Sequence, residues 1–272
     1  MKTFLFCFLI PFALWATQRE YFALFDHHPN ILGPLGEVQE IEVLLNEEEI
    51  AHAEKIAENR LLDLGITQEL AKEWSRVGII NEDQYLYWIR DAVRFPSGDF
   101  GTYDRILWKS GLNDSAGVGV LPVLPDGKVL VNLNYRHATR SWEIELPRGM
   151  RHPNETIEDT IKREVQEETG GQIDSFICLG ELNPDSGILC QAVPVYLGWI
   201  SAVTDNAQEF SEAIAANPIF TVNELKALYR NGTILLKVNG KDVEAKVRDA
   251  FLAYALFQAE IRGLLSTFQL EQ

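Results

Sequence analysis

The chain has 272 residues, enough for one large domain or two smaller ones, and 46% of them are hydrophobic while 24% are charged. This balance is typical of a globular protein and excludes collagen-like, wholly disordered and multi-spanning membrane proteins. The 40 acidic residues outnumber the 24 basic ones, giving a net charge of −16. No nucleic-acid partner is expected, because Lys and Arg supply most of the affinity for a phosphate backbone.

Residues 1–16 have the pattern of a signal peptide, with one Lys before a hydrophobic run that is too short to span a bilayer. Leu14 occupies the position where a small residue is preferred if cleavage follows Ala16, and Pro11 interrupts a helix there. Two interpretations stay open: a cytoplasmic protein whose N-terminus packs on its body, and an exported or anchored protein. Membrane contact is expected only through these residues, if at all.

Residues 20–104 are predicted to form a helical N-terminal extension. Three glutamates at 47–49 suit the positive end of a helix, and an apolar stripe follows them. A second helix is predicted over 69–77. A third is predicted from Glu82, with apolar residues at helical spacing, and it should end before Pro96 because the residue before a proline avoids the helical region.

Residues 105–272 are predicted to form an α+β domain. Runs rich in Val and Leu, separated by turn signals, predict strands at 116–124, 129–135, 142–146, 173–182 and 189–200. Helices are predicted at 156–169, 224–229 and 243–265. Cys178 and Cys190 fall on two of the predicted strands, where a disulfide and a pair of buried free thiols are both open.

The helix predicted at 156–169 turns carboxylates toward its buried side. Its hydrophobic stripe recurs every four positions: Ile157, Ile161 and Val165. Glu164 and Glu168 lie beside this stripe and Glu167 lies at its margin. Partly buried carboxylates at this spacing repel one another, and a hard divalent cation such as Mg²⁺ would offset the repulsion. The alternative is a solvated acidic helix face.

The segment from Gly149 to Gly170 resembles the Nudix box of the Nudix hydrolase family. Gly149, Glu155, the pair Arg163-Glu164, the pair Glu167-Glu168 and Gly170 stand at the family spacing, with an aliphatic Val165 between the pairs. Only the last position departs, where Gly171 replaces an aliphatic residue and is expected to loosen the exit from the helix. The resemblance implies a Nudix-type α/β/α sandwich with a mixed sheet over 105–272.

The resemblance also implies roles for individual residues. Glu164, Glu167 and Glu168 would be catalytic metal ligands for Mg²⁺, with Mn²⁺ as the alternative, and a backbone carbonyl at Arg148 or Gly149 would complete the shell. Structural roles within the motif fall to Glu155, which would hold Arg163, to Gly149, which would permit a tight turn near the metal, and to Gly170, which would cap the helix.

The strand that leads into the box resembles that of ADP-ribose and ADP-sugar pyrophosphatases. By this resemblance Arg136 would contact a substrate diphosphate, with Glu145 and Arg148 assisting. The family also draws a catalytic base from a loop beyond the box, and Glu212 is preferred here over Glu209.

These resemblances imply Mg²⁺-dependent hydrolysis of a nucleoside diphosphate linked to another moiety, ADP-ribose or an ADP-sugar first. A nucleoside monophosphate and a phosphorylated product would be released. Two alternatives are a catalytically silent nucleotide sensor with the Nudix fold and a hydrolase of nucleoside triphosphates. The partner is then a small nucleotide. The N-terminal extension is expected to cover the substrate cleft or to form a contact in a homodimer.

Overall fold

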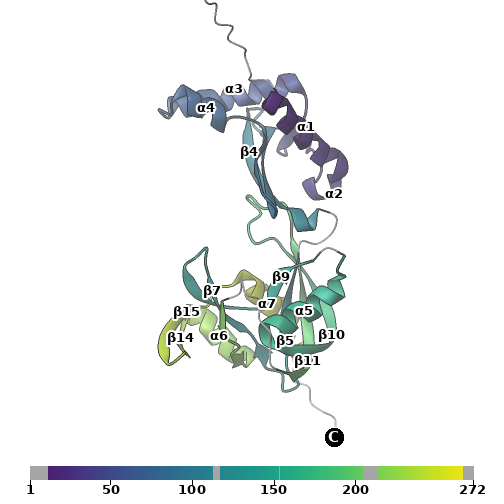
Figure 1. The fold of residues 1–272 in the computed structure, drawn as a ribbon, viewed down its shortest axis with the longest axis vertical. Coiled ribbons are helices and arrows are strands. Elements are labelled where there is room, and N and C mark those ends of the chain that lie inside the picture. The colour runs from purple at the N-terminus through teal and green to yellow at the C-terminus, as the bar shows by residue number, and fades with distance from the viewer. Residues whose placement is uncertain (1–11, 113–116, 153, 205–212, 266–272) are drawn as a thin grey trace, which may run out of the picture. The chain divides into compact units, whose positions relative to one another are not determined.

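The computed structural model describes residues 12–112, 117–152, 154–204 and 213–265, and these fall into two compact units (Figure 1). The first unit contains the chain up to Asn113 together with Asp185–Gln191. The second contains Asp114–Pro184 and Ala192–Gln272. The sequence predicted the boundary between 104 and 105, but the last strand of the first unit continues to Trp108. No described helix is both long and apolar enough to cross a bilayer.

The first unit combines helices with a four-stranded antiparallel sheet. Its helices are α1 (Phe12–His27), α2 (Pro29–Leu32), α3 (Glu47–Asp63), α4 (Gln68–Trp74) and the 3-10 turn η1 (Lys109–Gly111). Its strands are β1 (Glu42–Leu44), β2 (Gly78–Glu82), β3 (Leu86–Arg94) and β4 (Phe100–Trp108). Strand β3 pairs with all three others. A buried cluster that includes Tyr21, Ile50 and Ile89 forms the core of this unit.

The prediction of an N-terminal segment made only of helices is wrong, because the helix predicted from Glu82 is replaced by β3. Ile89 to Val93 are buried without interruption, as in a strand that is covered on both faces. Their apolar spacing suits a helix, but tertiary pairing decided the outcome. The Pro96–Gly98 stretch, which was predicted to end a helix, instead turns a hairpin, and the Phe95 N–H donates to the Asp99 carbonyl at 2.9 Å.

The segment Asp185–Gln191 adds to the free edge of β4. The Ile106 N–H donates to the Ile188 carbonyl at 2.8 Å, and the Cys190 N–H donates to the Ile106 carbonyl at 3.0 Å. The Gln191 side chain accepts from the Trp108 N–H and donates to the Trp108 carbonyl. Both Cys178 and Cys190 are free thiols, so the disulfide alternative is wrong, and Cys178 is exposed rather than buried. Burial raises the pKa of Cys190 to about 11, which keeps that thiol protonated at neutral pH.

The second unit contains two mixed sheets. One sheet runs in the order β10-β11-β5-β6-β13, with β9 also on β5, and the other in the order β12-β7-β8-β15-β14. The first sheet comprises β5 (Gly117–Val123), β6 (Val129–Leu130), β9 (Arg148–Met150), β10 (Gly171–Leu182), β11 (Val193–Val203) and β13 (Ile219–Phe220). The second comprises β7 (Asn132–Arg136), β8 (Ser141–Glu145), β12 (Ile214–Ala216), β14 (Thr233–Val238) and β15 (Lys241–Lys246). The pairs β5–β11 and β8–β15 are parallel.

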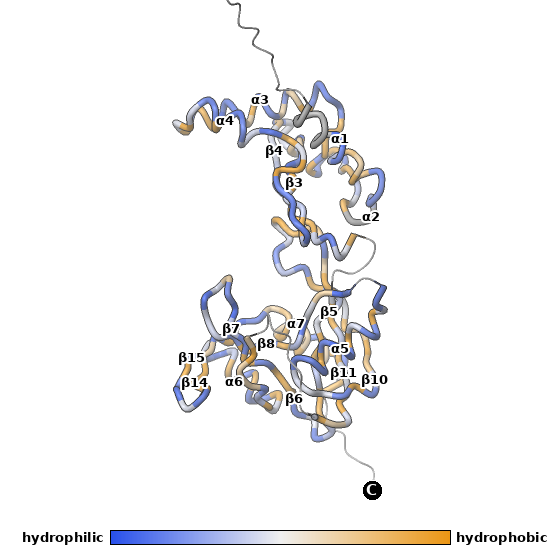
Figure 2. The backbone as a smooth tube through the Cα atoms, in the orientation of Figure 1, coloured by the Kyte–Doolittle hydropathy of each residue, from blue (hydrophilic) through white to orange (hydrophobic). Residues whose placement is uncertain are grey.

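Helices cover the first sheet with separate apolar clusters. Helix α5 (Ile157–Thr169) packs Ile161 and Val165 against Val118, Val120 and Ile200. Helix α7 (Ala250–Ile261) and helix α6 (Val222–Asn231) contribute to a larger cluster that also includes Leu121 and Leu197. Figure 2 shows hydrophobic residues along the central strands of this unit. The α+β domain with mixed sheets and covering helices that the sequence predicted is confirmed.

The C-terminal helix predicted over 243–265 is shorter than expected. Residues 233–246 form the hairpin β14–β15, and α7 begins at Ala250 because Asp249 caps it, accepting from the Leu252 N–H at 3.1 Å. The hairpin turns at Asn239-Gly240, both with positive φ. Asn-Gly is the strongest short hairpin signal in a sequence, so this element could have been predicted.

Candidate active site

Helix α5 carries the carboxylates of the motif, and local interactions define both of its ends. Thr156 and Asp159 form a reciprocal capping box at the start, and Gly170 ends the helix with φ of 72°. The packing around Gly171 explains why glycine replaces an aliphatic residue at this position of the motif. A Cβ there would lie 3.0–3.1 Å from atoms of Thr169, Val165 and Ile200, so the close packing favours glycine.

Arg163 lies among three glutamates of the motif. Its guanidinium donates to Glu155 at 2.7 and 3.0 Å, to Glu164 at 2.8 Å and to Glu167 at 3.0 Å. A further bond to the Met150 carbonyl at 2.9 Å fixes the guanidinium on β9. The hydrogen bonds from Arg163 lower the pKa of Glu155 to about 2. One arginine thus offsets the repulsion among neighbouring carboxylates, and Glu155 stays ionised.

Glu168, in the last turn of α5, is held by different donors. Its residue is 4% exposed, and its Oε2 accepts from the Asn132 side-chain amide at 2.5 Å and from the Arg148 N–H at 3.2 Å. Asn132 lies on β7 and is itself buried. The carboxylate therefore connects α5 to β7 and to the strand that precedes the motif.

Gly149 allows a carboxylate to approach the backbone. It lies in β9, and a Cβ at this position would lie 2.2 Å from both carboxylate oxygens of Glu164. The reason for glycine is this close approach, since Gly149 is not among the glycines with positive φ and makes no tight turn. The Gly149 carbonyl lies against Gly117, where a Cβ would be 2.2 Å from its oxygen. This contact directs the carbonyl toward β5.

The donor chemistry of this cluster fits a hard divalent cation. Glu164 and Glu168 are buried, Glu167 is partly exposed, and all of them offer carboxylate oxygens, which Mg²⁺ prefers. Within the described residues no three acidic, His or Cys side chains are already gathered as a metal-binding group. The reason is that Glu164 and Glu167 turn to Arg163 while Glu168 turns to Asn132.

A second cluster, beside the first, is built from arginines. Arg136 on β7 donates to both oxygens of Glu145 at 2.5–2.8 Å, and Arg148 lies 3.6 Å from Glu145. Arg148 also contacts Asp249 at 2.5 Å, and its guanidinium lies 4.8 Å from the centre of the Phe251 ring. Burial raises the pKa of Glu145, and the two arginines oppose this rise. The sequence-predicted residues Arg136, Glu145 and Arg148 are thus in contact.

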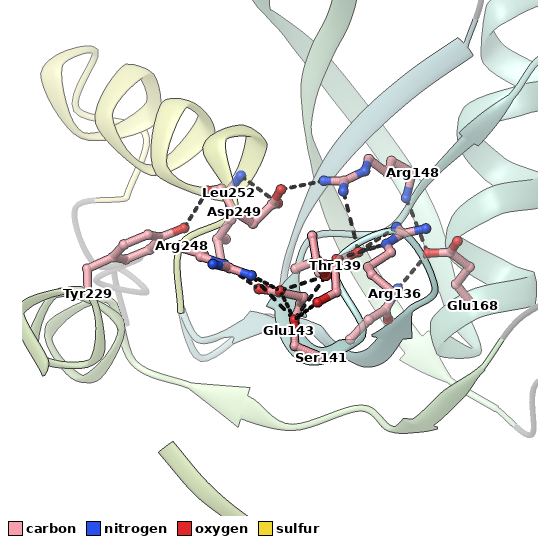
Figure 3. Close-up of polar contacts among 12 residues, drawn as sticks. Arg136, Thr139, Ser141, Glu143, Arg148, Glu168, Tyr229, Arg248, Asp249 and Leu252 are labelled. Carbon is pink, nitrogen blue, oxygen red and sulfur yellow. Dashed lines mark hydrogen bonds and ion pairs between the residues drawn. The ribbon is translucent and has the colours of Figure 1, made fainter. Parts of the chain in front are cut away.

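Figure 3 shows how Arg148 joins the two clusters, with Asp249 on one side and Glu168 on the other. A neighbouring acid on β8, Glu143, faces Arg248 at 2.7 Å and accepts from Ser141 and Thr139. Burial by itself would raise the pKa of Glu143, but these bonds outweigh burial and hold the pKa below its ordinary value. A charged network therefore extends along the face of β8.

Three contributors were missed by the sequence analysis: Asn132, Asn217 and Asp249. Asp249 carried a signal, because an Asp just before an apolar helical run is a typical N-cap. The two asparagines carried none, since their partners lie 36 and 49 residues away. Glu212, the predicted base, and its alternative Glu209 lie outside the described residues.

Comparison with known proteins agrees with this architecture. Residues 114–232 match the family model of the NUDIX domain. A crystal structure of an ADP compounds hydrolase is similar with a TM-score of 0.53 and 17% sequence identity, over 70% of this chain and 91% of that one. A comparison with curated proteins gave no significant match. The resemblance to Nudix hydrolases that the motif indicated is confirmed.

Proposed function

We propose that this Nudix hydrolase, whose NUDIX domain spans residues 114–232, cleaves the diphosphate of a nucleoside diphosphate linked to another moiety, with ADP-ribose or an ADP-sugar as the first candidate. Water would attack one phosphorus and form a new P–O bond. The anhydride P–O bond would break, and the bridging oxygen would leave on the other phosphate. The products would be a nucleoside monophosphate and a phosphorylated partner.

The observation that carries this proposal is the junction of the two clusters at Arg148. Its backbone N–H bonds a carboxylate of α5 while its guanidinium contacts Glu145 and Asp249. A diphosphate needs positive charge on both of its phosphates. The carboxylates of α5 suit a cation for one phosphate, and the partly exposed guanidiniums of Arg136 and Arg148 suit the other.

The side chains would divide the work of binding. Arg136 offers a planar fork that matches phosphate oxygens, and Glu145 keeps that fork in one orientation through two carboxylate oxygens. Arg148 is restrained by Asp249 and by the face of Phe251. Side chains that are already held in position lose little conformational entropy when the substrate binds, which favours the reactive geometry.

Glu164, Glu167 and Glu168 would hold Mg²⁺, with Mn²⁺ as the alternative. When bound, this ion would neutralise charge that develops on the phosphoryl oxygens. Arg163 would hold Glu164 and Glu167 beside each other, while Asn132 and the Arg148 N–H hold Glu168. The proton of the attacking water would pass to a carboxylate base, for which Glu212 is our candidate.

A substrate panel tests this proposal. Purified protein is incubated with ADP-ribose, an ADP-sugar and nucleoside triphosphates, with Mg²⁺ or with EDTA, and the nucleotide products are separated by chromatography. We expect Mg²⁺-dependent release of AMP from the first two compounds. Preferred hydrolysis of a triphosphate would contradict the substrate class, and absence of hydrolysis of every compound would contradict the enzyme assignment in favour of a sensor.

A further inference from the structure

The side-chain amide of Asn132 contacts the carboxylate of Glu168, and this contact depends on which end of the amide faces the acid. Its nitrogen donates to Glu168 Oε2 at 2.5 Å. If the amide were rotated by half a turn, its oxygen would face the carboxylate and repel it. The position of the Asn132 nitrogen therefore decides whether Glu168 is held or pushed away.

Asn217, between β12 and β13, fixes that choice. Its side-chain nitrogen carries two hydrogens, and the structure uses both. One is donated to Asn132 Oδ1 at 2.9 Å and the other to the backbone carbonyl of Glu168 at 2.8 Å. Because Asn217 presents only donors to this spot, the oxygen of Asn132 must face Asn217 and its nitrogen must face Glu168. The Glu168 carbonyl that accepts from Asn217 belongs to the last turn of α5, where carbonyls lack partners within the helix.

The three residues thus close a ring of hydrogen bonds around the end of α5. All its donors are neutral amides, in contrast to the guanidinium that Glu164 and Glu167 share. A neutral donor orients the Glu168 carboxylate without cancelling its charge, and the charge is what attracts a cation. Burial of Asn132, at 1% exposure, excludes competing water from the contact.

We propose that Asn132 and Asn217 are positioning residues that orient Glu168 for a divalent cation, Asn132 directly and Asn217 by fixing the amide of Asn132. The inference rests on the proposed function, because it assumes that Glu168 is a ligand. It predicts an order of effects that packing alone does not produce. Asn217→Asp preserves shape, yet it presents acceptors to Asn132 and draws away the nitrogen that Glu168 needs.

The test is a direct titration of Mn²⁺ into the full chain without substrate, followed by electron paramagnetic resonance of the free ion. Removing a residue that hydrogen-bonds to a metal ligand typically weakens metal affinity by about 10–100-fold, and we expect this loss for Asn132→Leu. Asn217→Asp should weaken binding more than Asn217→Ala, although it is the closer match in shape. Thr169→Val is the matched control, since it removes a buried hydroxyl that bonds the Val165 carbonyl in the same turn of α5. Thermal melting of each variant reports its fold.

The outcomes separate the two proposals. Wild-type Mn²⁺ affinity in a folded Asn132→Leu variant would overturn the positioning role. The role would also be overturned if Asn217→Ala weakened Mn²⁺ binding as much as Asn217→Asp does, or if Thr169→Val weakened it as much as the Asn variants do. The positioning role is supported if Asn132→Leu weakens Mn²⁺ binding, if Asn217→Asp weakens it more than Asn217→Ala, and if the Thr169→Val control keeps the wild-type affinity. Absence of hydrolysis by the wild type in the substrate panel would instead refute the proposed function, whatever the titration gives.

Discussion

The two halves of the candidate site differ in how their charged side chains are balanced. On α5 one guanidinium, Arg163, contacts three glutamates, whereas on β8 one buried carboxylate, Glu145, contacts two arginines. With Glu168 included, the helix half has four carboxylates against one guanidinium and a formal charge of −3. In the arginine half the two guanidiniums are balanced by Glu145 and Asp249. The excess negative charge thus lies in the helix half, which suits a cation, whereas the arginine half is formally balanced.

The largest effect of a single substitution is expected at Glu168, in the half with excess negative charge. Replacing it with Gln removes one negative charge from the half that has an excess, so we expect kcat to fall by about 10²–10³-fold, equivalent to about 3–4 kcal/mol of transition-state stabilisation. The melting temperature should stay close to that of the wild type. Glu158→Gln, on the exposed face of the same helix, is the control and should keep full activity. Undiminished Mg²⁺-dependent turnover by the Glu168 variant would refute its role as a ligand.

The arginine half is tested by Arg136→Lys, which keeps the charge but loses the fork. We expect kcat/KM for ADP-ribose to fall by about 10-fold or more, since a point charge cannot make paired bonds to phosphate oxygens or to Glu145. Steady-state kinetics measures the change. Arg140→Lys in the turn after β7 serves as the control because Arg140 contacts His137 and is exposed. Equal kinetics of the Arg136 and Arg140 variants would exclude a specific role for the fork.

A smaller effect is expected from Asp249→Asn, which removes one of the two charged partners of Arg148, leaving Glu145, while retaining a good helix cap. We expect a few-fold loss of kcat/KM, because Arg148 would be less firmly oriented, and a melting temperature within a few degrees of the wild type. Kinetics and thermal melting on one preparation separate the two contributions. A large loss of stability without a kinetic change would assign Asp249 to the fold alone.

The smallest effect concerns the pH dependence of stability at Glu155. Its pKa in the folded protein is lowered to about 2 by Arg163, so the stabilising contribution is fully present above the ordinary glutamate pKa and is lost as pH falls toward about 2. Glu155→Gln should therefore be less stable than the wild type at pH 7, and the difference should shrink in acid. Urea unfolding at several pH values measures this. A difference that is constant with pH would mean that the ionised carboxylate contributes nothing.

The three carboxylates of α5 could be grouped from the sequence because they share one helix. Glu164, Glu167 and Glu168 follow a single period, so their common face is a local property. Asp249, by contrast, reaches Arg148 across 101 positions, and Asn217 reaches Glu168 across 49. Such pairs are set by how strands are ordered in the sheets, which no local spacing encodes.

The fold could be predicted where turn residues separate hydrophobic strand segments, as at β5 and β10. It could also be predicted for α5, whose apolar residues follow the helical period. The prediction failed at β3, where Ile89, Ala92 and Val93 have helical spacing but belong to a run that is buried on both faces of a strand. Pairing with three neighbouring strands decided between the two, and that is a property of the whole first unit.

The return of Asp185–Gln191 to β4 has a practical consequence for dissecting the molecule. A truncation after residue 113 would leave the backbone groups of Ile106 unpaired along an exposed edge strand, which invites aggregation. A fragment starting at 114 would keep this segment but lose the strand on which it folds. Each fragment would therefore lack contacts that the intact chain makes at this segment. Separating them would require a short turn in place of the segment and a synthetic peptide to complement β4.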